Sequence, residues 1–269
     1  MNYYNQRIVH TGPYVEIWDY EKSISLNSDT IEGEKVEIGE SKNKNQKRKS
    51  FDELDEQEQH ERLRRMNKTR LDAKWRLLRI VDCNFDNSTS FLTLTTKENI
   101  VIRDEFTNMF KKFVKRFNYH VYKTKKSQLK YIGVLERQKR GAWHAHVLLF
   151  SVPFVEHNKL LGLWGHGAIR INKLDHLDDL SNAGRYVVKY MEKGIGQELV
   201  ESFGKKAYLY SRNLSKPIES KMYLDKPLDL EKSVVLYETE YEGKIFRGGH
   251  LVNNKVRYRK VLLTKEDEK

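Results

Sequence analysis

Trp143-His144-Ala145-His146-Val147-Leu148-Leu149-Phe150 is the stretch of this sequence that decides the fold. Its apolar, β-branched and aromatic residues predict a buried strand, and side chains two apart on a strand share one face. His144 and His146 therefore present two imidazoles on the same side, which is half of a shell for a divalent metal. The alternative is a half-solvated sheet face that binds no metal, and this stretch alone leaves both open.

A carboxylate comes within reach of the imidazoles from the preceding strand. Residues Leu129 to Glu136 predict that strand, and the basic segment Arg137 to Gly141 predicts a turn. A short hairpin pairs its strands in antiparallel register, so Glu136 can lie beside both histidines. Two histidines and one glutamate suit Mn²⁺ or Mg²⁺ with open positions, and Mn²⁺ is the better match for imidazole. An ordinary solvated turn residue is the alternative.

A second group of reactive side chains lies further along the chain. Asp175 to Lys193 predicts a helix on which Tyr186 and Tyr190, four residues apart, share a face with Lys189 and Lys193 close by. A phenol with a pKa of about 10 is a poor nucleophile on its own. Nearby ammonium groups stabilise a phenolate, and a metal-polarised phosphate is more electrophilic. Tyrosines packed in a core remain the alternative.

Strand and helix patterns also precede the histidines. Phe91-Leu92-Thr93-Leu94-Thr95 predicts a strand, whose Thr hydroxyls could meet a phosphate or a neighbouring backbone. Asn99 to Tyr119 predicts an amphipathic helix. Phe51 to Val81 predicts a longer helix, which Ser50 or Asp52 could cap. Its basic side chains either follow a phosphate backbone or are simply solvated: Arg62, Arg64, Arg65, Lys68, Arg70, Lys74, Arg76 and Arg79.

The composition favours a polyanionic partner. The 269 residues carry a net charge of +12, so nucleic acid is the first candidate and an anionic membrane surface the second. No apolar run reaches the length of a membrane span, and no signal-peptide core is present. The single cysteine, Cys83, excludes an intrachain disulfide and a cysteine-rich zinc site, which fits a reducing cytoplasm.

Four regions are expected along the chain. Residues 1–50 predict a β-like segment and a polar linker, 51–82 the basic helix, 89–217 the core that holds the histidines, and 218–269 a β-rich extension. The fold class is therefore α+β. No phosphate-binding loop ending in Gly-Lys-Ser or Gly-Lys-Thr is present, so strand separation is expected to fall to a host helicase.

In their order along the chain, these motifs resemble those of HUH endonucleases, and specifically two-tyrosine rolling-circle replication initiators of plasmids or single-stranded DNA phages. Phe91 to Thr95 is similar to the first motif, His144-Ala145-His146 to the second with a small Ala between the histidines, and Tyr186 to Lys193 to the third. Glu136 corresponds to a third metal ligand of many members. The resemblance covers about Thr89 to Pro217.

The resemblance implies a central antiparallel sheet of about five strands with helices packed on it, related to RNA-recognition domains, plus N-terminal helical and C-terminal β extensions. It also implies a mechanism. His144, His146 and Glu136 hold Mn²⁺ or Mg²⁺ while a tyrosine nicks single-stranded or hairpin origin DNA, which leaves a 5′-phosphotyrosyl link and a 3′-hydroxyl primer. Alignment of the motif favours Tyr190 as the principal nucleophile and Tyr186 as the second, with Lys189 and Lys193 orienting the phenolates.

The implied partners are origin DNA and a host helicase and DNA polymerase, in the cytoplasm of a bacterial cell, with no membrane. Two alternatives stand beside this hypothesis. A relaxase or transposase of the same superfamily would use the same chemistry for transfer or transposition. A basic DNA- or RNA-binding protein would hold nucleic acid on a sheet face without cutting it.

Overall fold

The structure is a computed structural model that describes residues 2–26, 49, 51–174, 208–226, 233–247 and 249–263. It divides into two compact units, here called the site unit (Ser50–Ser215) and the terminal unit (Met1–Lys49 with Lys216–Lys269). Each unit contains a five-stranded antiparallel sheet, and the three helices of the described residues belong to the site unit. The predicted α+β class is confirmed.

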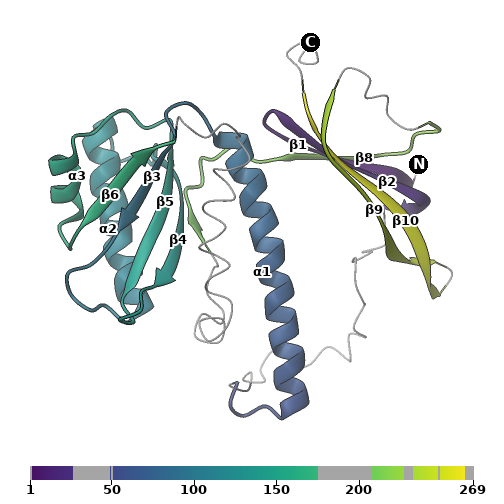
Figure 1. The fold of residues 1–269 in the computed structure, drawn as a ribbon, viewed down its shortest axis with the longest axis horizontal. Coiled ribbons are helices and arrows are strands. Elements are labelled where there is room, and N and C mark those ends of the chain that lie inside the picture. Colours follow the sequence, from purple (N-terminus) through teal and green to yellow (C-terminus); the bar gives the residue numbers. More distant parts are fainter. Residues whose placement is uncertain are drawn as a thin grey trace. The chain divides into compact units, whose positions relative to one another are not determined.

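The site unit is built around a sheet with the strand order β6-β3-β5-β4-β7. The histidine strand β5 occupies the centre, as the resemblance to replication initiators implied, and the predicted hairpin joins it to β4. The first predicted strand, β3, pairs with β5 on its other side (Figure 1). The strands are β3 (Ser90–Leu94), β4 (Lys130–Arg137), β5 (Trp143–Phe150), β6 (Ile169–Lys173) and β7 (Leu209–Tyr210).

Helices α2 (Arg103–Tyr122) and α3 (His157–Trp164) contribute to an apolar core on one face of this sheet. Helix α2 begins at Arg103 and not at Asn99, because the backbone before it is used by the histidine strand. The carbonyls of Ile100 and Val101 accept hydrogen bonds from the Trp143 backbone N–H and indole N–H, each at 2.9 Å. The predicted apolar stripe of α2 is buried at Phe106, Phe110, Phe113 and Phe117.

Helix α1 (Glu56–Asn84) packs against the opposite, histidine-bearing face only near its end, where Leu77 and Val81 are buried. Its first half extends past the sheet (Figure 1). The predicted caps Ser50 and Asp52 are wrong, because Asp55 forms a capping box with Glu58. The Asp55 carboxylate accepts from the Glu58 N–H at 2.8 Å, so the helix starts after Asp55.

The terminal unit joins the two ends of the chain in one sheet, with the strand order β8-β1-β2-β10-β9. The N-terminal hairpin of β1 and β2 pairs with β8 on one side and with β10 on the other. Local sequence pattern carries no sign of this pairing between distant segments. The strands are β1 (Tyr3–Thr11), β2 (Tyr14–Ser25), β8 (Ile218–Met222), β9 (Val234–Arg247) and β10 (His250–Leu262).

Two predicted segments lie outside the described residues. They are the linker expected up to residue 50, apart from Lys49, and the tyrosine-bearing helix expected from Asp175 to Lys193. Among the helices that are described, none is both long and apolar enough to cross a membrane.

Candidate metal centre

The turn between β4 and β5 sets the register that brings the candidate ligands together. The Gln138 N–H donates to the Ala142 carbonyl at 2.9 Å, and the Gly141 N–H donates to the Gln138 carbonyl at 2.8 Å. Gly141 has a φ of 86°, a conformation that glycine adopts without strain. In the resulting register Glu136 lies directly opposite His144. A shift of one residue would send the carboxylate to the other face of the sheet.

Three side-chain atoms converge at this point of the hairpin. The Nε2 atoms of His144 and His146 each lie 2.9 Å from Oε2 of Glu136, and they lie 3.1 Å from each other. The side chains are 13%, 6% and 12% exposed for His144, His146 and Glu136. Such burial rules out the alternative of a half-solvated strand face.

The spacing of these donor atoms suits a six-coordinate metal. Adjacent ligands about 2.1 Å from an octahedral ion are about 3.0 Å apart, whereas tetrahedral ligands at that distance are about 3.4 Å apart. The observed separations of 2.9, 2.9 and 3.1 Å match one face of an octahedron. Two imidazoles and a carboxylate could therefore hold a divalent cation and leave three positions open for water or phosphate oxygens.

Strand β3 supports the more buried histidine from the side opposite β4. Thr93 pairs with His146 in register, and its hydroxyl lies 3.3 Å from Nδ1 of that imidazole. The ring of Phe91 stacks on the same imidazole with centroids 5.6 Å apart. If Nδ1–H donates to the Thr93 hydroxyl, the Nε2 lone pair faces the metal position. The sequence left the role of this hydroxyl open, since only the pairing of β3 with β5 brings it to His146.

One tyrosine of the described residues packs on the histidine-bearing face, namely Tyr208, which precedes the edge strand β7 and contacts the cluster of Phe91 and Val134. Burial raises the pKa of Tyr208, and Tyr210 raises it further, while Arg76 lowers it. A raised pKa disfavours the phenolate, so burial makes Tyr208 a weaker nucleophile. The sequence-predicted nucleophiles and cations, Tyr186, Lys189, Tyr190 and Lys193, lie outside the described residues.

Comparison with known proteins gives one match. Residues 89–195 match the family model of the replication-associated protein known as ORF2 or gene 2 protein. Neither a curated protein nor a solved structure matches the chain. The matched range contains Thr93, the three candidate metal ligands and both tyrosines of the third motif. The resemblance to replication initiators is thereby confirmed over this part of the chain.

Proposed function

Because residues 89–195 match a replication-associated family, we propose that this chain is a replication initiator that nicks single-stranded origin DNA. It would stay attached to the new 5′ end and leave a 3′-hydroxyl that primes rolling-circle replication. A host helicase and a host DNA polymerase would then extend that primer. The observation that carries this proposal is the buried Glu136, His144 and His146 group, which lies inside the matched range.

In this proposal the side chains of the hairpin bind and orient. Glu136, His144 and His146 would hold Mn²⁺ or Mg²⁺, and Thr93 would keep the His146 ring in the tautomer that binds through Nε2. When bound, the ion would polarise the scissile phosphate. The low exposure of the three ligands limits competition from water at the reacting phosphate.

The nucleophile in this proposal is Tyr190. Its phenolic oxygen forms a bond to phosphorus, the bond from phosphorus to the 3′-oxygen breaks, and that oxygen takes up a proton and leaves as a hydroxyl. The Lys193 and Lys189 ammonium groups would stabilise the phenolate. Tyr186 lies four residues before Tyr190 and would make the second transfer that rejoins ends at termination. The phosphodiester energy is retained in the phosphotyrosyl bond, so rejoining needs no ATP.

A covalent-adduct assay tests this function. The full chain is incubated with Mn²⁺ and a pool of random-sequence single-stranded oligonucleotides labelled at their 3′ ends. We expect an SDS-resistant labelled protein band, because the label stays on the fragment whose 5′ end is joined to tyrosine. Tyr190→Phe should reduce the band strongly, and the double variant Tyr186→Phe, Tyr190→Phe should abolish it. The control Tyr210→Phe, on edge strand β7, should leave it unchanged.

Two outcomes would contradict the proposal. If no band forms with Mn²⁺, Mg²⁺ or any other divalent cation, the chain is a binding protein and not a nickase. If the band persists in the double variant, the nucleophile has been assigned to the wrong residues. Sequencing the trapped DNA would identify the preferred site, and a hairpin next to that site in a small circular replicon would distinguish replication from transfer or transposition.

A further inference from the structure

The two faces of the sheet in the terminal unit differ in kind. Cross-strand register places Trp18 opposite Tyr258, and Val256 opposite both Tyr20 and Tyr241, so these rings lie on one side. We call this side the aromatic face. Its seven rings come from four strands: Tyr4, Tyr14, Trp18, Tyr20, Tyr237, Tyr241 and Tyr258.

Cations are handled differently on the two faces. On the opposite face three basic side chains each have a carboxylate partner: Lys255 with Glu240 at 2.7 Å, Arg257 with Glu238 at 2.6 Å, and Arg259 with Asp19 at 2.7 Å.

On the aromatic face three cations lie over rings. The Arg7 guanidinium is 4.7 Å from the centre of the Trp18 ring, the Lys221 ammonium 5.2 Å from that of Tyr4, and the Lys260 ammonium 4.3 Å from that of Tyr14. Positive charge interleaved with aromatic rings is the composition of a surface that binds single-stranded nucleic acid.

One row of side chains crosses the sheet at right angles to its strands. Tyr237 lies 6.1 Å from Tyr258, Tyr258 lies 5.0 Å from Trp18, and Trp18 carries the Arg7 guanidinium. The outer end of the row is accessible, since Tyr237 is 56% exposed and its neighbour Tyr241 is 39% exposed. The described part of the terminal unit contains strands but no helix, so no described helix covers these rings.

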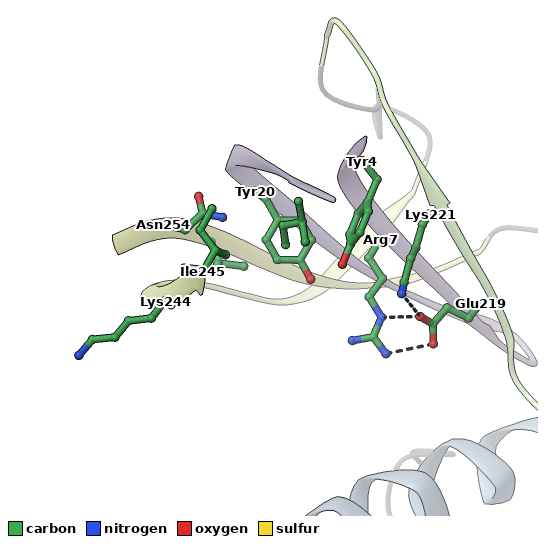
Figure 2. Close-up of a pocket in the computed structure, with 11 residues that line it drawn as sticks. Tyr4, Arg7, Tyr20, Glu219, Lys221, Lys244, Ile245 and Asn254 are labelled. Carbon is green, nitrogen blue, oxygen red and sulfur yellow. Dashed lines mark hydrogen bonds and ion pairs between the residues drawn. The ribbon is translucent and has the colours of Figure 1, made fainter. Parts of the chain in front are cut away.

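A pocket of about 250 Å³ opens on the same face. Figure 2 shows the rings of Tyr4 and Tyr20 beside each other in this pocket, with Arg7 and Lys221 on one side. The two rings meet edge to face with centroids 5.8 Å apart. Glu219 contacts both cations, at 3.0 Å from Arg7 and 3.8 Å from Lys221. Two cations and one carboxylate leave this side of the pocket with one net positive charge.

We propose that the aromatic face binds single-stranded DNA. Unpaired bases would stack on Tyr237, Tyr241 and the rings of the pocket, and the phosphates would lie near the cations. Stacking requires free base faces, which a duplex does not offer, so the rings favour a single strand. The choice of DNA over RNA rests on the proposed replication function. The binding surface itself lies outside the family match at residues 89–195.

Fluorescence anisotropy of the full chain with a labelled oligothymidylate of about 20 nucleotides, in EDTA, tests this surface. The double variant Tyr237→Leu, Tyr241→Leu should weaken binding by about tenfold or more, because base stacking on aromatic rings is lost. The control is Phe246→Leu, on the same strand β9 but on the opposite face and 50% exposed. Binding by this control should change by less than about twofold.

A second matched pair tests the charges. Lys260→Gln should weaken binding and reduce its salt dependence by about one phosphate contact, because Lys260 lies on the aromatic face. Lys255→Gln removes the same charge from the opposite face of the same strand β10 and should leave the salt dependence unchanged.

Several results would overturn the proposal. Equal losses in the variants of both faces would mean that net charge or folding is responsible. Tighter binding of a duplex with the same sensitivity would make this a duplex site. A photo-crosslinking oligonucleotide that contains 5-bromodeoxyuridine should label peptides of β2, β9 or β10, and labelling confined to the site unit would exclude the aromatic face. Because EDTA prevents metal-dependent nicking, a failed adduct assay would leave these binding results unaffected.

Discussion

The two five-stranded sheets of this chain bury different things. The sheet of the site unit is packed with helices on both faces and encloses three polar side chains, Glu136, His144 and His146, at one point. The sheet of the terminal unit has no described helix and spreads its aromatic and cationic groups over one face. Polar groups that converge in a packed core suit chemistry on one bond. Rings and charges spread over a surface suit an extended polymer.

The largest effect should come from breaking the packing that distinguishes the two sheets. Phe113 is 1% exposed and packs against Phe117 and Trp164, so Phe113→Ala should lower the free energy of unfolding of the site unit by about 3–5 kcal/mol. Phe246→Ala, half exposed on the terminal sheet, should change it by less than about 0.5 kcal/mol. Urea unfolding followed by hydrogen exchange measures each unit. Equal costs would contradict the difference in packing.

The next effect concerns the metal. Glu136→Gln keeps the size of the side chain but removes its charge, so the Kd for Mn²⁺ should rise by more than about 100-fold, or about 2.7 kcal/mol. Isothermal titration calorimetry measures this change. Mn²⁺ should also raise the melting temperature of the wild-type chain and not that of the variant. An unchanged Kd would mean that the three side chains form an ion-paired cluster that binds no metal.

The terminal sheet has its own buried charge, which satisfies itself within the fold. The Asp19 carboxylate accepts from Arg259 at 2.7 Å and from Gln6 at 2.6 Å, and Arg259 is only 5% exposed. Asp19→Asn should destabilise the terminal unit by about 1.5–3 kcal/mol, because a guanidinium is left buried without its counter-charge. Glu238→Gln, from an exposed pair, should have a much smaller effect on melting. Loss of Mn²⁺ binding in Asp19→Asn would contradict the independence of the two units.

The smallest of these effects separates two threonines on one segment of the chain. Thr93→Val removes the hydroxyl beside His146 Nδ1 and should weaken Mn²⁺ binding by about tenfold, or about 1.4 kcal/mol. Thr95→Val is the matched control, since the Thr95 hydroxyl donates to the Ala168 carbonyl, away from the histidines. Its Mn²⁺ affinity should stay unchanged. Equal losses would show that the strand, and not the hydroxyl, supports the metal ligands.

Short-range features of this chain could be predicted from the sequence. The hairpin of β4 and β5 follows from two apolar runs separated by a basic turn, and strand periodicity puts His144 and His146 on one face. The apolar stripe of α2 follows from helical periodicity in the same way. Because β4 and β5 are neighbours in sequence, the position of Glu136 beside the imidazoles was predictable too.

The sequence was less informative where a cap or a distant partner decides. Ser50, Asp52 and Asp55 are all residue types that cap helices, and only Asp55 also has Glu58 three residues later to complete the box. The half-exposed Leu71 and Trp75 fit helical spacing as well as the buried Leu77 does. Which turns of α1 are buried depends on where the sheet ends, and local spacing carries no record of that.

The sequence by itself determined the candidate metal ligands and the charge of this protein, because the ligands are close in the chain and charge is a sum over residues. Only the tertiary structure decided that Thr93 and Phe91 support His146, because strand order brings them together from some fifty residues away. It also decided that the two ends of the chain form one sheet with an aromatic face. Pairing between distant strands depends on the whole fold, and strand periodicity carries no record of the partner.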